Sequence, residues 1–278
     1  MKHFFIIPNA EKPETIDFSR QLSEYIRSKG GSAVMAENRC FDGKRFVRAD
    51  EIPKDTEAVI VLGGDGTIIQ AARDTDECRL PVMGVNMGTV GYLAETDSAR
   101  AFSAVDRLFS DEYMIEERMM LHGLLIRSGE VLCENSGLND IVLRTSGIST
   151  VEFEFCVNGE AIKKYLGDGM ILSTPTGSTA YNLSAGGPIV MPSASMILAT
   201  PLNPHTMLQR SIVLPDDSEV TLRITGIRRG EVLLSFDGTV YEGLACGDEI
   251  QVRKDEKKVR LLKLEKNSFL EVLRNKLE

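Results

Sequence analysis

The five residues Gly63-Gly64-Asp65-Gly66-Thr67 combine types and spacing that suit phosphoryl chemistry. They follow an apolar run and precede a predicted helix, and their glycines let backbone N–H groups approach an anion closely. A carboxylate in such a loop repels phosphate oxygens, so Asp65 needs a role that offsets the repulsion. It can accept a proton from an attacking hydroxyl or help to hold Mg²⁺. The loop therefore predicts phosphoryl transfer, although glycine content alone fits a tight turn capped by Asp65 equally well.

A second candidate site is the polar stretch from Ser173 to Pro188, which follows the apolar Met170-Ile171-Leu172. Its hydroxyls and exposed backbone groups can contact the edge of a purine, and a ring such as Tyr181 can stack on the purine face. Composition alone favours a solvated Ser/Thr-rich connector. The order of the residues, rather than their composition, indicates a binding site.

Acidic and amide side chains elsewhere could bind a ribose. Asn139-Asp140 places an amide beside a carboxylate, and Asp168, between two glycines, can accept a hydrogen bond from a ribose or an amide NH₂. Taken singly, each is better explained as a turn residue. By default, Asp237-Gly238 is a hairpin turn and Arg118 is exposed to solvent.

The expected helices and strands that would position these residues follow a different order in the two halves of the chain. Up to about residue 118, strands alternate with helices, as in a doubly wound α/β domain with a mostly parallel sheet. The last two expected strands are continuous apolar runs, typical of a parallel sheet covered on both faces. The glycine loop falls at the carboxyl end of one of them, where ligands bind in such sheets. The expected strands are His3–Pro8, Ala33–Ala36, Ala58–Leu62 and Pro81–Val85, and the expected first helix is Pro13–Lys29.

From about residue 119, the pattern predicts a β-rich, mostly antiparallel half. Strands Val151–Val157 and Glu160–Leu166 are joined by Asn158-Gly159, a strong hairpin signal. A last helix is expected over Asn267–Leu277 with Ser268 as its N-cap, and its periodicity does not decide which half it packs on. Further expected strands are Ser211–Leu214, Glu219–Thr225, Val232–Phe236, Glu249–Arg253 and Val259–Leu264.

The composition is ordinary for a globular protein and argues against several classes of partner. Of the 278 residues, 42% are hydrophobic and 26% are charged, with a formal net charge of -9 and no dense Lys/Arg run. Nucleic acid and anionic membranes are therefore not expected as partners. No apolar segment approaches membrane-spanning length, and the amino terminus reads as a buried strand rather than a signal peptide. The five scattered cysteines indicate a reducing, cytoplasmic location.

At these motifs the sequence resembles the NAD kinase family. The family's Gly-Gly-Asp-Gly-Thr is intact at residues 63–67, and its Asn-Asp/Glu pair stands at 139–140. Its long Thr-Pro-Thr-Gly-Ser-Thr-Ala-Tyr-x-x-Ser-x-Gly-Gly-Pro signature runs from Thr174 to Pro188. The first motif is shared with lipid kinases and distant phosphofructokinases, whereas the long signature is close to diagnostic. Further similarities are Gly84-Val85-Asn86-Met87-Gly88, Gly91-Tyr92-Leu93, Pro204-His205, Asp237-Gly238 and Ser268-Phe269.

The resemblance implies an α/β domain over residues 1–118 and a β-rich NAD-binding domain over residues 119–264, with residues 265–278 packing back on the first. The active site would lie between the domains. The implied reaction transfers the terminal phosphoryl group of ATP, with Mg²⁺, to the 2′-hydroxyl of the adenosine ribose of NAD, giving NADP and ADP. The resemblance also implies a homodimer or homotetramer.

The resemblance implies a role for each residue that stands at a matching position of a family motif. Asp65 is similar to the family's proton acceptor, and Asn139 and Asp140 to its ribose ligands. No residue is assigned as a metal ligand. The implied phosphate-binding residues are Gly63, Gly64 and Thr67. The other implied NAD-binding residues are Gly66, Thr179, Tyr181 and Ser184 (the last three toward the adenine), Asp168 and Ala180 (toward the nicotinamide), Asn203 and Thr239.

Two departures from the family pattern concern the substrate. Leu166 stands where many members have a basic residue, which leaves the choice between NAD and NADH open, and Thr239 replaces a common glutamine. Two other functions fit some of the same motifs. A non-catalytic NAD(P)-binding regulator would keep the pocket but gains little from a carboxylate facing phosphates. A diacylglycerol-type lipid kinase shares the glycine loop, but the negative net charge disfavours an amphiphile-binding surface.

Overall fold

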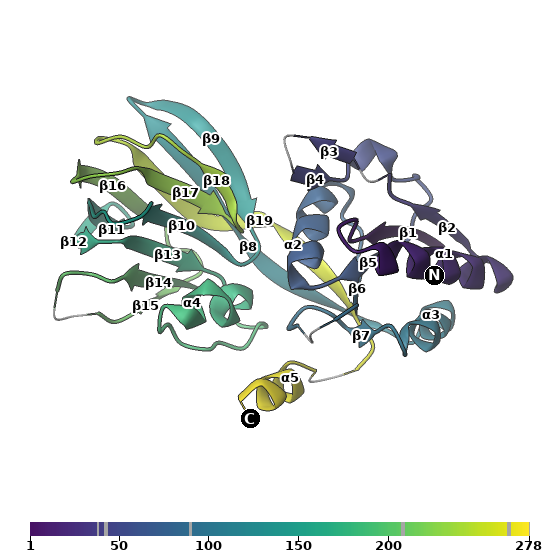
Figure 1. Cartoon of the computed structure of the whole chain (residues 1–278). Coiled ribbons are helices and arrows are strands. Elements are labelled where there is room, and N and C mark those ends of the chain that lie inside the picture. Colours follow the sequence, from purple (N-terminus) through teal and green to yellow (C-terminus); the bar gives the residue numbers. More distant parts are fainter. Residues whose placement is uncertain (38, 42–43, 89–90, 207–208, 266–267, 278) are drawn as a thin grey trace. The chain divides into compact units, whose positions relative to one another are not determined.

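The computed structural model describes the whole chain except residues 38, 42–43, 89–90, 207–208, 266–267 and 278 (Figure 1). By their internal contacts the residues form two compact units. The first comprises Met1–Glu117 and Val259–Glu278, and the second comprises Arg118–Lys258. None of the helices in the described part of the chain has the length and apolar character that crossing a membrane requires.

The first unit is built on a parallel sheet, as predicted. In spatial order its strands are β6 (Val82–Asn86), β5 (Ala58–Gly63), β1 (His3–Pro8) and β2 (Ser32–Met35). Every residue of β5 is buried, as expected for a strand with both faces of its sheet covered. Two further strands pair with β6 over only a few residues. Leu261 of β19 (Glu249–Lys263) pairs with Val82, and β7 (Thr96–Asp97) pairs with Val85-Asn86.

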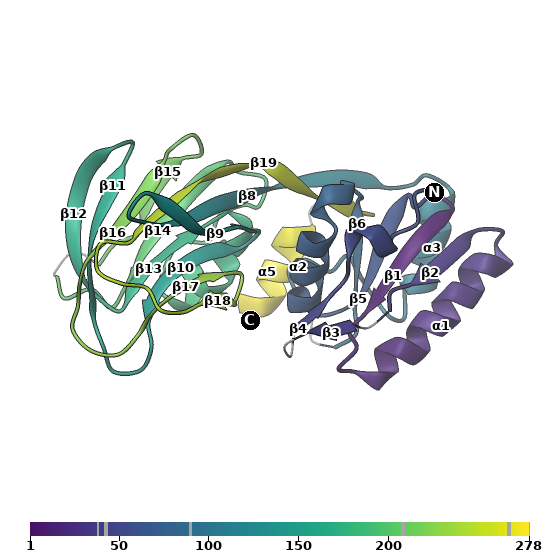
Figure 2. The same ribbon diagram turned by 90° about the horizontal axis from the view of Figure 1, so that it is seen from above.

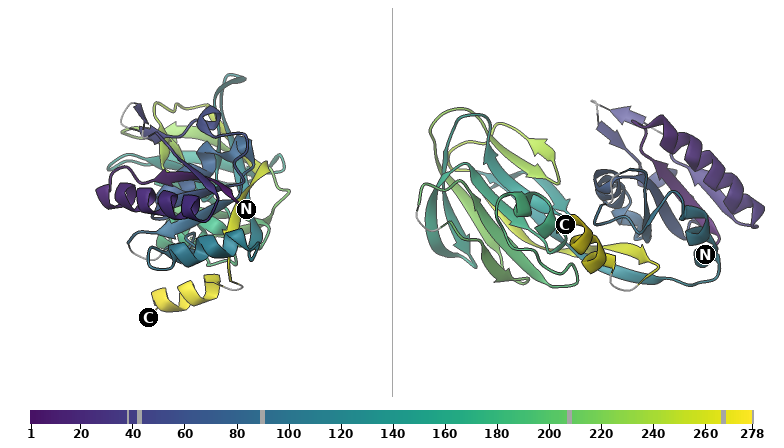
Figure 3. Two further views of the ribbon diagram at one scale, coloured as in Figure 1. Left: turned by 90° about the vertical axis from the view of Figure 1, so that its right-hand side faces the viewer. Right: turned by 60° about the horizontal axis from the view of Figure 1, so that its bottom comes forward.

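Helices cover both faces of this sheet. On one face lie α1 (Pro13–Ser28) and α3 (Ala101–Phe109), and on the other lies α2 (Asp65–Asp74) (Figures 2 and 3). Leu22 and Ile26 of α1 share one buried apolar cluster with Leu108 of α3 and with side chains of the strands. On the opposite face, Ile68 of α2 lies so close to Gly84 of β6 that a Cβ atom there would come within 2.4 Å of its Cδ1.

The last helix is confirmed and belongs to the first unit. It is α5 (Ser268–Leu277), and the ring of its Phe269 lies 5.8 Å from the ring of Tyr92, centroid to centroid. Asn267, where the helix was predicted to begin, lies outside the described residues. The remaining short elements of this unit are β3 (Arg39–Phe41), β4 (Lys44–Phe46), η1 (Ala49–Glu51) and η2 (Asp76–Cys78).

The second unit is antiparallel, with two layers of strands around a large apolar core. Side chains such as Leu143 and Phe236 from one layer meet Phe153 and Leu222 from the other in that core. One layer has, in spatial order, β15 (Ile212–Pro215), β14 (Met196–Leu202), β13 (Gly169–Ser173), β10 (Asp140–Thr145), β17 (Val232–Phe236) and β18 (Thr239–Tyr241). The other has β12 (Glu160–Gly167), β11 (Val151–Val157), β16 (Val220–Ile227) and β19, with β8 (Met114–Arg127) and β9 (Glu130–Gly137).

The predicted hairpin is confirmed, whereas one predicted break between two strands is not. Asn158 and Gly159 join β11 to β12 with φ of 52° and 80°, the left-handed conformations that favour this residue pair. The break expected between Glu249–Arg253 and Val259–Leu264 was wrong, because β19 is one continuous strand. Its charged middle stays extended because Lys254 pairs with Asp216 and the Ser136 hydroxyl donates to Asp255.

Candidate active site

Asp65 is held at the start of α2 by a neighbouring segment of the first unit. Strand β5 ends at Gly63, Gly64 is extended at the N-cap, and Asp65 is the first helical residue. The backbone N–H of Tyr92 donates to Asp65 Oδ2 at 2.7 Å, and that of Leu93 donates to Oδ1 at 3.1 Å. A carboxylate can accept about four hydrogen bonds. Each oxygen therefore keeps an acceptor position for a further donor.

The glycines around Asp65 differ in how much space surrounds them. A Cβ atom at Gly91 would lie 2.0 Å from Asp65 Oδ1, so only glycine lets the chain pass this close to the carboxylate. A Cβ at Gly64 or Gly66 would meet no atom within 4 Å. Their missing side chains thus leave open space at the amino end of α2, where backbone N–H groups and the helix dipole favour an anion.

Polar groups gather at the carboxyl ends of the neighbouring strands. Asn9, directly after β1, donates through Nδ2 to the Thr67 hydroxyl at 3.2 Å. The Asn86 side chain, at the end of β6, both donates to and accepts from the backbone of Gly88. A Cβ at Gly88 would lie 3.7 Å from Lys12 Nζ. This edge of the first unit therefore combines amide groups, a hydroxyl and one lysine ammonium.

In the second unit, Asp237 organises the turn that carries Asn139 and Asp140. Its carboxylate accepts hydrogen bonds from the backbone N–H groups of Leu138, Asn139 and Asp140, at 2.7 to 3.0 Å. Asp237 does lie in a tight turn, with φ of 47°, as expected by default. That expectation missed its second role, because the partners stand 97 to 99 residues away and no local signal links them.

Asp140 is a buried carboxyl group, 7% exposed. Burial, and to a lesser extent the negative charge of Asp237, raise the pKa of Asp140 from 3.8 to about 7. In the described part of the chain, no hydrogen bond to the Asp140 carboxyl oxygens is found. The group is therefore available to a ligand, as acceptor or donor according to its protonation.

The stretch from Thr174 onward packs directly on this turn. The Thr174 hydroxyl donates to Leu138 O at 2.6 Å and accepts from the N–H of Gly177 at 3.1 Å. A Cβ at Gly177 would lie only 2.0 Å from the carbonyl oxygen of Asn139. The structure therefore brings Asn139, Asp140 and the long signature together at one end of β10 and β13.

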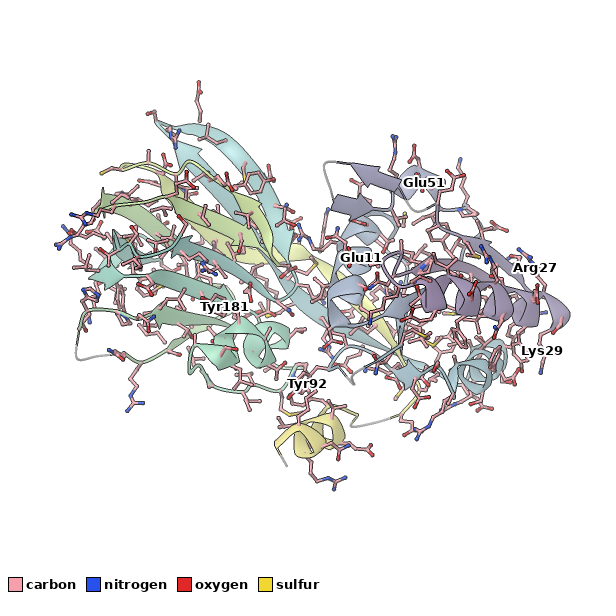
Figure 4. The ribbon with its side chains drawn as sticks, viewed as in Figure 1. Glu11, Arg27, Lys29, Glu51, Tyr92 and Tyr181 are labelled. Atoms are coloured by element: carbon pink, nitrogen blue, oxygen red, sulfur yellow. The ribbon has the colours of Figure 1, made fainter. Side chains whose placement is uncertain are left out.

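Buried polar side chains fix the course of this stretch. Asn182 is fully buried, donates to Ser178 O and Pro188 O, and accepts from the Thr200 hydroxyl at 2.7 Å. The stretch includes two short helices, η3 (Thr176–Thr179) and α4 (Tyr181–Ser184). Of the predicted ligand residues in this stretch, Thr179 and Ala180 are half-buried, whereas Tyr181 (labelled in Figure 4) and Ser184 are exposed.

Asp168 and Asn203 form a pair at a different place. Asn203 Nδ2 donates to Asp168 Oδ2 at 2.8 Å. Asp168 directly precedes β13, whereas Ser173 at the other end of this strand pairs with Asp140. The length of β13 separates the two places by roughly 13 Å, from the rise per residue of a strand. Within this unit, then, the structure does not bring Asp168 and Asn203 together with Asn139 and Asp140.

Thr239 and Arg118 also belong to the second unit. Thr239 is half-buried in β18, where it pairs with Phe236 beside the Asp237 turn. The expectation that Arg118 is exposed was wrong, since it is only 2% exposed and its Nη1 donates to the Thr176 hydroxyl at 3.3 Å. Its burial could not be read from the sequence, because a lone arginine is exposed in most proteins.

The sequence models of the ATP-NAD kinase N-terminal and C-terminal domains match residues 4–113 and 138–264. The chain belongs to the ATP-NAD kinase family. The family member named NAD kinase from Lachnoclostridium phytofermentans is 40% identical over 282 residues, covering 99% of both chains. That from Agathobacter rectalis is 41% identical over 283 residues, covering 100% of this chain and 99% of the relative.

Solved structures show the same fold. The crystal structure of a yeast NADH kinase complexed with NADH superposes with a TM-score of 0.87 at 24% identity, covering 100% of this chain and 87% of that chain. An NAD kinase from Archaeoglobus fulgidus in complex with ATP gives a TM-score of 0.76 at 17% identity, covering 99% of this chain and 98% of that chain. The predicted α/β and β-rich halves are therefore confirmed as the family fold.

A metal ion would find few protein ligands in the part of the chain that the structure describes. Among the residues that the structure describes, no three His, Cys, Asp or Glu side chains cluster closely enough to hold a metal ion between them. In the glycine loop, residues 63–67, the side chain of Asp65 is the carboxylate that could bind a metal ion. Any metal ion acting there would take most of its ligands from water or from a bound nucleotide.

Proposed function

We propose that this protein is an NAD kinase that transfers the terminal phosphoryl group of ATP to the 2′-hydroxyl of the adenosine ribose of NAD. The observation that carries this proposal is the Asp65 carboxylate, oriented by two backbone N–H groups in an open glycine loop at the start of α2. The full-length similarity to relatives named NAD kinase supports it. The products are NADP and ADP.

The chemical step needs a base and correct placement of the reactants. The 2′-oxygen forms a bond to the γ-phosphorus, the bond from that phosphorus to the bridging oxygen breaks, and ADP leaves with that oxygen. The 2′-hydroxyl proton goes to Asp65, whose oxygens each keep an acceptor position. Gly63, Gly64 and Thr67 lie at the amino end of α2, which favours the phosphates of a nucleotide.

Recognition of NAD is assigned to the second unit, with Gly66 contributing from the glycine loop. Asn139 and Asp140 would accept hydrogen bonds from ribose hydroxyls, because no hydrogen bond among the described residues reaches the carboxyl oxygens of the buried Asp140. Tyr181, exposed beside Thr179 and Ser184, would stack on the adenine. Asp168 and Asn203, with Ala180, would serve the nicotinamide end, and Thr239 would line the same ligand.

Mg²⁺ fits this donor set as a companion of ATP. Mg²⁺ keeps several waters and binds through one or two carboxylates together with nucleotide phosphates, and Asp65 offers the carboxylate. When bound, the ion would neutralise charge that develops on the transferring phosphoryl group. We propose a cytoplasmic location, since Cys133, Cys156 and Cys246 form no disulfide among the described residues, and a homodimer or homotetramer.

The test is the Asp65→Asn variant, incubated with ATP, Mg²⁺ and NAD and assayed for NADP. Loss of a general base lowers turnover by about 10²- to 10⁴-fold. NAD binding, measured by calorimetry, should persist, because the amide keeps the shape of the side chain. Near-normal turnover of the variant would refute the assigned role. A wild-type protein that binds NAD but forms no NADP would instead be a binding module, and parallel assays with NADH, polyphosphate and a diacylglycerol define the specificity.

A further inference from the structure

The segment from Gly91 to Glu95 connects Asp65 to the carboxyl-terminal part of the first unit. At one end, the backbone N–H groups of Tyr92 and Leu93 hold the two oxygens of the Asp65 carboxylate. A Cβ atom at Gly91 would lie 2.0 Å from Asp65 Oδ1, so the backbone of the segment lies directly against the carboxylate. The position of Asp65 therefore depends on the position of Tyr92.

The Tyr92 side chain is in turn held by α5 (Figure 4). Its ring lies 5.8 Å from the ring of Phe269, and Lys276 Nζ lies 4.5 Å from the centre of the Tyr92 ring. Aromatic pairs and cation–π contacts at these distances are attractive. Burial, and to a lesser extent the negative charge of Asp65, raise the pKa of Tyr92.

The other end of the segment is fixed to the chain that leads into α5. The Glu95 carboxylate lies 2.8 Å from Lys263 Nζ and accepts hydrogen bonds from the N–H groups of Leu264 and Glu265. The guanidinium of Arg107 donates to Leu264 O. Both the residues just before α5 and α5 itself therefore contact the segment from Gly91 to Glu95. All of these contacts lie within the first unit.

We infer that Tyr92 is a positioning residue of the reaction, and that the docking of α5 on its ring sets the orientation of the Asp65 carboxylate. The inference rests on the proposed function. Catalysis by a positioned group is sensitive to small displacements, since an error of about 1 Å can lower the rate about 100-fold. Loosening Tyr92 should therefore lower kcat, whereas the KM for NAD should change little because the NAD-binding residues belong mostly to the second unit.

The experiment compares four single variants of the full-length chain. Tyr92→Ala removes the ring that α5 contacts, and Phe269→Ala removes its partner. Tyr92→Phe keeps the ring and should restore most of the rate. Leu270→Ala is the matched control, because Leu270 is 51% exposed on the same helix. We expect kcat to fall about tenfold in the two variants that lose contacts, from the sensitivity of positioned groups, with KM for NAD within about twofold.

A fifth variant calibrates the effect. Gly91→Ala places a Cβ atom 2.0 Å from Asp65 Oδ1 and so displaces the carboxylate directly. Its φ is not in the left-handed region, so alanine is excluded by space and not by backbone conformation. Its kcat should fall about 100-fold. Thermal unfolding and calorimetric NAD binding of every variant establish that the protein is folded.

Wild-type kcat in folded Tyr92→Ala and Phe269→Ala would overturn the inference while leaving the proposed function intact. So would an equal loss in Leu270→Ala, because the effect would then not pass through Tyr92. If the wild-type protein itself forms no NADP, the proposed function fails, and this inference fails with it.

Discussion

Replacing Asp140 by asparagine should change how the stability of the protein depends on pH. In the folded protein, burial and the nearby Asp237 raise the pKa of Asp140 from 3.8 to about 7. Between these pH values the folded state keeps a proton that the unfolded chain releases. Unfolding then becomes more favourable as the pH rises, by up to about 1.4 kcal/mol per pH unit. The stability that this group contributes is complete below its unfolded pKa and is lost as the pH rises through the folded pKa.

The magnitude follows from the shift. A change from 3.8 to about 7 is roughly three pKa units, so Asp140 ionisation costs ~4 kcal/mol of folded stability between about pH 4 and pH 8. Because Asp140 is 7% exposed, solvent screens this cost little. Asparagine has nearly the same shape and does not ionise. The free energy of unfolding of Asp140→Asn relative to wild type should therefore rise by about 4 kcal/mol over this range.

The assay is urea unfolding followed by far-ultraviolet circular dichroism at several pH values. The informative quantity is the difference in unfolding free energy between variant and wild type at each pH, because groups that do not interact with Asp140 ionise alike in both proteins and cancel. Asp217→Asn is the matched control, since Asp217 is an exposed aspartate of the same unit. A difference between Asp140→Asn and wild type that stays constant from about pH 4 to pH 8 would refute the reasoning, because it would mean that Asp140 ionises as freely as an exposed group.

Two further predictions concern buried contacts in each unit. Glu95→Gln removes the negative charge that faces Lys263, and both side chains are at most 4% exposed. The free energy of unfolding should fall by about 3–5 kcal/mol, seen as a lower melting temperature that the exposed control Glu24→Gln does not show. Gly177→Ala forces a Cβ atom within 2.0 Å of the Asn139 carbonyl oxygen. It should cost about 1–3 kcal/mol of stability and weaken NAD binding by calorimetry, and unchanged values of both would contradict the packing described for that turn.

Much of the fold could be predicted because its signals are local. The apolar runs at β5 and β6, the proline at the start of α1 and the Asn158-Gly159 turn each act on neighbouring residues through sterics and backbone hydrogen bonds. The strand break expected near Lys254 failed for the opposite reason. The sequence pattern predicted two separate strands there, but distant partners, Asp216 and Ser136, keep the chain extended.

The sequence by itself determined the chemical character of this protein, because the glycine loop around Asp65 and the long signature from Thr174 carry their chemistry in contiguous residues. Only the tertiary structure decided how those residues are held. Asp237 binds the turn at Asn139 across about a hundred residues of chain, and Tyr92 holds Asp65 from 27 residues away. Contacts of this kind depend on which strands and helices pack together. Packing is settled by the whole chain, and no local pattern encodes it.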